Sequence, residues 1–139
     1  MANLRLDIVT AERLVFSGMV DSLTAPGAEG ELGILPRHTP LLTTLQPGDI
    51  RFRVGEEEQD IAVSGGFMEV LPDHVVVLAD TAERADEIDI ARAEAALERA
   101  RVLLRNRKDV DPTDLTRLAE AMRRSQVRLK VARRRRSQP

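Results

Sequence analysis

Four arginines in the last third of the chain are spaced so that they fall in pairs on helix faces. Arg92 and Arg99 are seven residues apart, and Arg124 and Arg128 are four apart, so each pair occupies one face of an α-helix. A guanidinium group matches phosphate oxygens in charge and geometry, and several together can bind a polyphosphate. The spacing therefore indicates anion binding. The alternative is that these arginines only cover a solvated helix face.

The residue types that most enzymes need are scarce in this sequence. The 139 residues include no cysteine, which excludes disulfides, thiolate metal sites and cysteine nucleophiles. The two histidines, His38 and His74, do not form a pair with metal-ligand spacing. There is also no GxxxxGKS or GxxxxGKT phosphate-binding loop, and no nucleophile stands beside an obvious base. We therefore predict no catalytic residue, no metal site and a protein that is not an enzyme by itself.

Charge is divided unevenly along the chain. Residues 1–86 hold 15 acidic and 6 basic side chains, a balance of −9, whereas residues 87–139 hold 8 acidic and 15 basic side chains, a balance of +7. The division coincides with a change in hydrophobic period, so we predict two domains, 1–86 and 87–139. Arginine outnumbers lysine by 19 to 2. This bias suits phosphate or carboxylate recognition, and a GC-rich genome is the alternative explanation.

Composition argues against two classes of partner. No run of about 18 apolar residues is present, so we expect no segment that spans a bilayer. The basic run 133–136 can contact phosphates, but the chain has no tryptophan or tyrosine and only three phenylalanines for stacking on bases. Together with the acidic first domain, this predicts no nucleic-acid partner.

Short strands separated by turn residues dominate the first eighty positions. Leu4, Leu6 and Ile8 alternate with polar residues, which is the period of a half-buried strand. Glycine and proline recur every eight to ten residues and supply the turns. Further strands are expected at 14–20, 22–25, 31–35, 42–45, 50–54, 59–64, 67–71 and 75–79. This pattern predicts an all-β domain, an antiparallel sandwich or flattened barrel.

A seven-residue period replaces the strand pattern from about residue 86. One apolar seam consists of Ile90, Ala93, Leu97, Ala100 and Leu104, and a second consists of Leu115, Leu118, Met122, Ser125, Leu129 and Ala132. Such narrow stripes are typical of one helix packing on another. Asp86 or Asp89 can cap the first helix, and Asp111 or Thr113 the second. The short polar linker 106–112 predicts an antiparallel hairpin, which depends on docking because such helices are marginal alone.

Three sequence blocks, taken in order, resemble the ε subunit of bacterial F-type rotary ATP synthases. They are GELGILPRHTPLL at 30–42, VSGGFMEVL at 63–71 followed by VVLADTAER at 76–84, and IDIARA at 88–93. The resemblance covers essentially the whole chain. It implies an N-terminal β-sandwich of about ten strands and a C-terminal hairpin of two helices, the architecture that the residue patterns also predict.

The resemblance further implies a mechanical role. An ε subunit is a non-catalytic rotor subunit of the central stalk that helps couple c-ring rotation to ATP synthesis through the γ subunit, and its C-terminal helices can inhibit ATP hydrolysis. The implied partners are the γ subunit, the c-ring loops and the catalytic β and α subunits. The implied location is the cytoplasmic face of the bacterial cell membrane, reached only through the complex and with no cofactor required.

Two sets of contact residues follow from the resemblance. Residues 26–38 align with the segment that contacts γ and the c-ring, and the candidates there are Glu29, Glu31, Arg37 and His38. The alternative is an ordinary turn and core strand, and for Ile34 and Leu35 we expect packing. The residues implied to pair with acidic groups of the catalytic subunits during inhibition are Arg123, Arg124, Arg128 and Lys130.

A regulatory nucleotide site is implied as well. Some bacterial members bind ATP at a motif that reads Ile/Leu-Asp-x-x-Arg-Ala, which Ile88, Asp89, Arg92 and Ala93 match. The other candidates are the polyphosphate arginines Arg99, Arg124 and Arg128, with Glu83 and Asp89 orienting the nucleoside or the arginines. ATP would favour the folded hairpin, because a ligand stabilises the state that it prefers. Alternatively Asp89 is only a helix cap. A free-standing ATP-sensing module is the alternative function.

Overall fold

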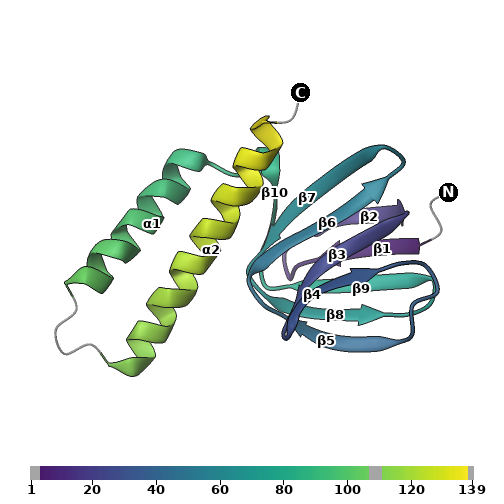
Figure 1. Ribbon diagram of the computed structural model, residues 1–139, viewed down its shortest axis with the longest axis horizontal. Coiled ribbons are helices and arrows are strands. Elements are labelled where there is room, and N and C mark those ends of the chain that lie inside the picture. Colours follow the sequence, from purple (N-terminus) through teal and green to yellow (C-terminus); the bar gives the residue numbers. More distant parts are fainter. Residues whose placement is uncertain (1–3, 107–110, 138–139) are drawn as a thin grey trace.

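Alternating apolar residues build a curved sheet, and the seven-residue period builds two helices beside it (Figure 1). The computed structural model describes residues 4–106 and 111–137. The strands are β1 (Leu4–Val9), β2 (Leu14–Val20), β3 (Ser22–Gly27), β4 (Gly30–Ile34), β5 (Leu41–Leu45), β6 (Gly48–Val54), β7 (Glu57–Val63), β8 (Gly66–Val70), β9 (His74–Ala79) and β10 (Ala82–Arg84). The helices are the 3₁₀ turn η1 (Ala85–Glu87), α1 (Ile90–Arg105) and α2 (Pro112–Ser137).

The ten strands form one sheet that folds over on itself. Their order is β10-β7-β6-β3-β5-β8-β9-β1-β2, with β4 beside β3. This confirms the predicted sandwich or flattened barrel followed by a two-helix hairpin. All neighbouring strands run antiparallel except β1 and β9, which are parallel. The sequence pattern does not predict that pair, because alternation fixes which side chains face inward but not the direction of the neighbouring strand.

The sandwich has a hydrophobic core of its own. Leu4, Leu6 and Ile8 of β1 are fully buried, and the rings of Phe16 and Phe52 lie 4.4 Å apart between their centroids. All buried members of this core lie between residues 4 and 82, and none belongs to a helix. The β-domain therefore does not need the hairpin to complete its core.

The helix boundaries follow from local capping. The Asp89 carboxylate accepts a hydrogen bond from the Arg92 backbone N–H at 3.1 Å, so Asp89 rather than Asp86 caps α1. The Asp111 carboxylate accepts from the Thr113 N–H at 2.9 Å, and Pro112 begins α2. Most of the predicted linker 106–112 lies outside the described residues.

The helices pack along their predicted seams, and α2 lies between α1 and the sandwich (Figure 1). The buried seam residues are Ala93, Leu97, Ala100, Ser125, Leu129 and Ala132. A second apolar contact, which the sequence analysis did not predict, joins α2 to the sandwich: Val131 packs with Ala62, Ala85 and Ile88. This contact is small, and ion pairs and hydrogen bonds make up the other described contacts between the hairpin and the β-domain.

The junction between sandwich and hairpin is held by Arg13 and Glu87. The two Arg13 Nη atoms donate to the two Glu87 carboxylate oxygens at 2.9 and 3.1 Å, and Nη2 also donates to the Ala82 carbonyl. These hydrogen bonds lower the pKa of Glu87 below its ordinary value. The next arginine, Arg84, donates from its side chain to the Val15 carbonyl at 2.6 Å. The start of the hairpin is thus tied to β2 on the far edge of the sheet.

Candidate functional site

The six residues 88–93 begin α1, and three of the four motif positions have packing or capping roles. Ile88 is buried in the contact between η1, α2 and the sandwich. Asp89 caps the helix, as the simpler alternative predicts. Ala93 is fully buried between the two helices. Asp89 and Arg92 are both exposed, but the Asp89 carboxylate is engaged as the cap, so Arg92 is the motif position whose side chain is available to a ligand.

The four arginines predicted to bind a polyphosphate lie on one side of the hairpin. Arg133 of α2 pairs with Glu94 of α1 at 2.8 Å, and each of these two follows a seam residue directly. On both helices, a residue one position after a seam residue in the sequence therefore lies on the same side of the antiparallel pair as Glu94 and Arg133. A residue one position before a seam residue lies on the opposite side. The arginines that precede the seam are Arg92, Arg99, Arg124 and Arg128. The fold thus brings together the two pairs that the spacing predicts.

These arginines differ in whether they are already engaged. Arg128 Nε lies 2.7 Å from Glu83 Oε1, and its Nη2 donates to Oε2 at 3.1 Å. Arg92, Arg99 and Arg124 are exposed, and within residues 4–106 and 111–137 their side chains make no ion pair. This side of the hairpin therefore presents three open guanidinium groups next to one that a carboxylate orients.

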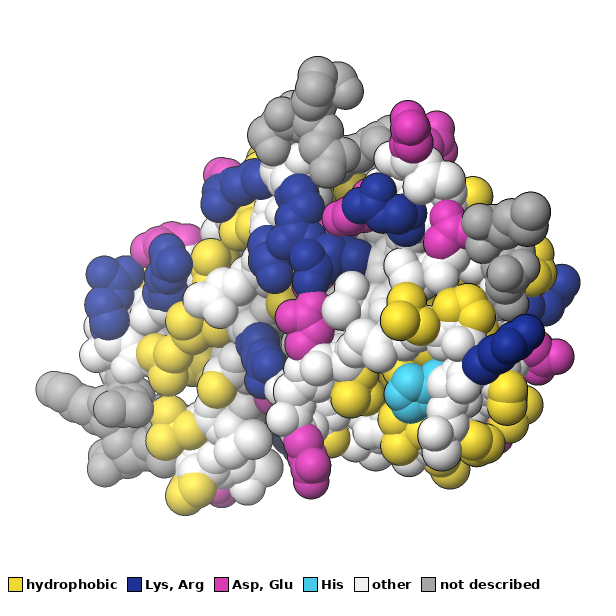
Figure 2. Space-filling view, turned by 45° about the vertical axis from the view of Figure 1, so that its right-hand side comes forward, with side chains coloured by type: hydrophobic (Ala, Val, Ile, Leu, Met, Phe, Trp, Pro, Cys, Tyr) yellow, Lys and Arg dark blue, Asp and Glu magenta, His cyan; other side chains and the backbone are white. Residues whose placement is uncertain are grey.

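Three of the four residues implied to act in inhibition, Arg123, Arg128 and Lys130, contact the sandwich in this structure, whereas Arg124 is exposed. Arg123 donates to the Gln46 side chain at 2.6 Å, and Lys130 Nζ lies 3.4 Å from Asp49 Oδ1. Figure 2 shows basic side chains gathered over the helices where they approach the sandwich. A hairpin that used these cations elsewhere would first have to break its contacts with the β-domain.

The segment 26–38 forms the β3–β4 hairpin and the loop that follows it. Glu29 is exposed at the turn, and Glu31 forms an ion pair with Arg51. Arg37 has a positive φ of 67° and its N–H donates to the Pro72 carbonyl at 2.6 Å. His38 Nδ1 lies 2.7 Å from the Thr39 carbonyl oxygen. All four predicted contact residues thus belong to one surface segment.

Two neighbours in that segment have opposite environments. Ile34 is 1% exposed, as expected, but Leu35 is 65% exposed, so the expectation that Leu35 packs is wrong. Strand β4 ends at Ile34, and the chain then turns outward, so the inward–outward alternation no longer applies to Leu35.

A broad apolar face on the outside of the sheet was missed by the sequence analysis. Phe67 of β8 and Leu78 of β9 are directly opposite each other and are 54% and 55% exposed. Leu42 of β5 and Leu14 of β2 add further exposed side chains on the same run of strands. Figure 2 shows hydrophobic side chains open on the sandwich surface. Strand residues that are apolar on both faces are the sequence signal for such a surface.

A cluster of Asp7, Ser17 and His74 on the outer sheet face has the residue types of a hydrolase triad but not its geometry. Asp7 Oδ2 lies 2.7 Å from His74 Nε2, and the Ser17 hydroxyl donates to the other Asp7 oxygen. The hydrogen bond from Ser17, opposed by partial burial and aided by His74 and Arg5, lowers the pKa of Asp7. The carboxylate stands between serine and histidine, so the imidazole is not placed to accept the serine proton.

The described part of the chain offers neither a cluster of metal ligands nor a helix that could cross a membrane. Residues 4–106 and 111–137 contain no cluster of three or more histidine, cysteine or acidic side chains that could hold a metal ion. Over the same residues, neither α1 nor α2 carries an apolar stretch long enough to cross a bilayer.

Comparison with known proteins relates both halves of the chain to one family. Residues 3–85 match the beta-sandwich domain of the ATP synthase delta/epsilon chain, and residues 86–133 match its long alpha-helix domain. The ATP synthase epsilon chain of Dehalococcoides mccartyi is 56% identical over 140 residues, covering 100% of this chain and 99% of its own. The epsilon chain of Herpetosiphon aurantiacus is 54% identical over 134 residues, covering 96% and 97% of the two chains.

Two solved assemblies contain chains with the same fold. One chain of the Euglena gracilis mitochondrial ATP synthase, in a structure of its OSCP, F1 and c-ring, superposes with a TM-score of 0.70 and 22% identity, covering 99% of this chain and 81% of that one. A chain from the central stalk and c-ring of the Tetrahymena thermophila enzyme gives 0.65 and 18%, covering 94% and 96%.

Proposed function

The chain belongs to the ATP synthase delta/epsilon-chain family, and on that premise we propose that it is the ε subunit of a bacterial F-type enzyme's central stalk. It is a non-catalytic subunit that turns with the rotor and helps couple rotation of the c-ring to ATP synthesis. A coupling element needs a rigid domain and a broad docking face. The self-contained core of the sandwich supports the first requirement, and its apolar outer face supports the second.

The observation that carries this proposal is the exposed apolar face formed by Leu14, Leu42, Phe67 and Leu78. Large apolar side chains that lie open on adjacent strands are typical of a protein interface. Their burial stabilises a complex by about 25 cal/mol for each Å² removed from water. We assign the γ subunit to this face.

The segment 26–38 is proposed to reach γ or the c-ring loops. Glu29 lies on an exposed turn, Glu31 and Arg37 are exposed, and His38 is half-buried in the loop after β4. Charged and hydrogen-bonding groups of this kind suit the polar loops of a membrane ring, because rim charges give register and specificity to an interface. The subunit would then be a peripheral part of the complex at the cytoplasmic face of the cell membrane.

Inhibition of ATP hydrolysis is assigned to the hairpin. The apolar contact between α2 and the sandwich involves few side chains, mostly alanine and valine, and the other described contacts are ion pairs and a hydrogen bond from Arg123 to Gln46. Such an interface permits release, because partly exposed ion pairs contribute little net stability. Once released, Arg123, Arg124, Arg128 and Lys130 would be available to acidic residues on the catalytic β and α subunits.

Deleting residues 87–139 tests the inhibitory role. We expect the truncated chain to fold, because its core lies between residues 4 and 82, and to bind the complex through the sandwich. An ATP synthase reconstituted with it should hydrolyse ATP several-fold faster than one with the full chain. Hydrolysis that stays unchanged, while the truncated chain still binds, would exclude an inhibitory hairpin but leave the rotor role intact.

A regulatory ATP site is proposed on the side of the hairpin that carries Arg92, Arg99, Arg124 and Arg128. Three open guanidinium groups next to the Glu83–Arg128 pair can surround a polyphosphate, since several charge-assisted hydrogen bonds form at once. Asp89, held in place as the cap of α1, fixes the turn that presents Arg92. ATP would act as a regulatory ligand that stabilises the docked hairpin.

Replacing Arg92 by alanine tests that site. We expect saturable one-to-one binding of ATP to the full chain in a calorimetric titration, and at least about a tenfold loss of affinity in Arg92→Ala, as for one charge-assisted contact of roughly 1.5–3 kcal/mol. Arg101→Ala is the matched control, because Arg101 is exposed on α1 but directly follows a seam residue and so lies on the other side. Equal losses in both variants, or no binding at millimolar ATP, would remove the nucleotide site.

A further inference from the structure

Two carboxylates of neighbouring strands lie beneath the last described side chains of α2. Asp49 is on β6 and Asp60 is on β7. In the register of these two strands Arg51 lies opposite Asp60, so the two aspartates lie diagonally on one face of the sheet. Both side chains are only 11% exposed. Two acids held together and away from water strongly disfavour a state in which both are ionised.

The helix covers these acids with cations. Arg134 Nη1 lies 2.6 Å from Asp60 Oδ2 and 2.9 Å from Asp49 Oδ2, so one guanidinium bridges both strands. Lys130, one turn earlier, approaches Asp49, and from β6 Arg51 Nε lies 3.6 Å from Asp49 Oδ2. The other Asp60 oxygen, Oδ1, is buried and accepts no hydrogen bond within the described residues, so this oxygen can carry a proton.

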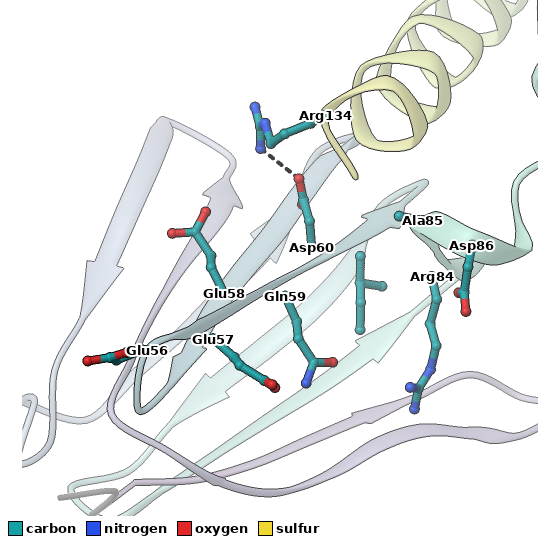
Figure 3. A pocket seen from close by; sticks show the side chains of 10 residues that line it. Glu56, Glu57, Glu58, Gln59, Asp60, Arg84, Ala85, Asp86 and Arg134 are labelled. Carbon is teal, nitrogen blue, oxygen red and sulfur yellow. Dashed lines mark hydrogen bonds and ion pairs between the residues drawn. The ribbon is translucent and has the colours of Figure 1, made fainter. Parts of the chain in front are cut away.

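Other charged groups near the pair are turned elsewhere or already engaged. Glu58, two residues before Asp60, pairs with Arg53 at 3.3 Å. Arg84 and Asp86 line the same cleft of about 470 Å³, but the Arg84 side chain is hydrogen-bonded to the Val15 carbonyl. Figure 3 shows Asp60 reaching toward Arg134 at the end of α2, while Glu56 and Glu57 lie apart from it at the β6–β7 turn.

These surroundings shift the pKa values of the two aspartates in opposite directions. Burial, and then the hydrogen bond and charge of Asp49, raise the pKa of Asp60 to about 7 despite the nearby Arg134. Burial also acts on Asp49, but the hydrogen bond from Asp60 and the charges of Lys130 and Arg134 outweigh it and lower the pKa of Asp49. The docked pair therefore binds one proton near neutral pH, with neutral Asp60 donating to ionised Asp49.

We propose that Asp49 and Asp60 form a proton-binding site that holds the hairpin on the β-domain, so that taking up a proton favours docking and losing it favours release. The site exists as described only when α2 covers it. Without α2 the pair faces water, where the two side chains can move apart and titrate close to their ordinary values.

The direction of the pH effect follows from this difference. The docked state binds a proton that the released state does not bind between about pH 4 and pH 7, so docking becomes more favourable as the pH falls through 7. Linkage limits the change to about tenfold in the docking equilibrium for each pH unit. Between pH 8 and pH 5.5 we expect docking to strengthen by roughly 30-fold.

Hydrogen exchange in the full chain measures docking even where release is rare. Helices of this kind are marginal when undocked, so amide protection in α2 reports the docking equilibrium once intrinsic exchange rates are divided out. In the wild type, protection of α2 should rise by roughly 30-fold from pH 8 to pH 5.5, while amides of β8 and β9 keep a constant protection.

Asp60→Asn is the decisive variant, because a carboxamide keeps the shape of the neutral acid and can donate to Asp49 at every pH. We expect its α2 protection to be nearly independent of pH. Asp49→Asn, which removes the like charge, should shift the wild-type dependence to lower pH. Glu58→Gln, a carboxylate on the same strand that pairs with Arg53, is the matched control and should keep the full wild-type dependence. Wild-type protection that does not change with pH, or a dependence that survives in Asp60→Asn, would overturn the proposal.

Discussion

The Phe67→Asp variant should lose most of its affinity for the γ subunit while remaining folded. Phe67 is more than half exposed on β8 and is paired with Leu78 on β9, so a polar side chain there meets solvent in the isolated chain. In the complex the same position would be buried. A carboxylate without a partner would then lose its hydration and gain nothing in return.

The expected size of the loss combines two terms. Burying a phenylalanine side chain contributes about 1.5–3 kcal/mol, which the variant forfeits. Burying an unpaired carboxylate adds a penalty of the order of 2 kcal/mol even after local relaxation. A total of roughly 3.5–5 kcal/mol corresponds to binding that is weaker by a factor of about 300 to 4,000.

The measurement is a titration of purified γ subunit with the full chain. Leu103→Asp is the matched control, because Leu103 is 60% exposed but lies on α1 rather than on the outer sheet face. The control should bind γ as the wild type does. Comparable losses in both variants, or none in Phe67→Asp, would mean that γ does not dock on this face. A rotor subunit would then have to bind γ through another surface.

Gly66→Ala should cost the β-domain much of its stability. Gly66 begins β8 with a φ of +133°, a conformation that residues with a side chain rarely adopt. A Cβ atom there would lie 2.1 Å from the Leu78 carbonyl oxygen and 2.9 Å from the Ala79 Cα, both backbone atoms that cannot turn aside. Backbone strain of about 1–3 kcal/mol and a clash of similar size add up to roughly 2–6 kcal/mol.

A loss of that size is comparable to the whole stability of a marginal domain. Urea unfolding followed by far-ultraviolet circular dichroism is the suitable measurement, since the chain has no tryptophan or tyrosine for intrinsic fluorescence. Gly33→Ala is the control, because no atom lies within 4 Å of its Cβ position. We expect that variant to unfold within about 0.5 kcal/mol of the wild type. A Gly66→Ala chain of wild-type stability would show that β8 and β9 can separate at this point.

The elements whose residues repeat at a fixed period were predictable from sequence. The alternation of Leu4, Leu6 and Ile8 and the turn glycines indicated the strands, and the seam residues indicated the helices and their pairing. Three-residue β10 was missed, because it is too short to show a period. The outward turn of Leu35 was missed for a related reason, since alternation ends where the strand does.

The parts that depend on register between distant segments were not predictable. Asp49 and Asp60 are adjacent only because β6 and β7 pair in the register that places Arg51 opposite Asp60. The sequence alone does not determine that register. Val127 and Val131 form a second apolar side of α2 that packs on the sandwich. The sequence does not show that the sandwich covers this side of the helix. The grouping of Arg92, Arg99, Arg124 and Arg128, by contrast, was predictable, because it depends only on the spacing of residues within each helix.

The ion pair between Arg13 and Glu87 has a geometric consequence for a released hairpin. It anchors the chain immediately before Ile88, so the pivot lies at residues 88–89 and β10 stays in the sheet. A hairpin that swings there as a rigid lever reaches about 39 Å, the length of the 26 residues of α2. If the two helices straighten end to end, the 16 residues of α1 and the 26 of α2 together span about 63 Å. The distance between this fixed pivot and the neighbouring subunits therefore decides which of them either form can touch.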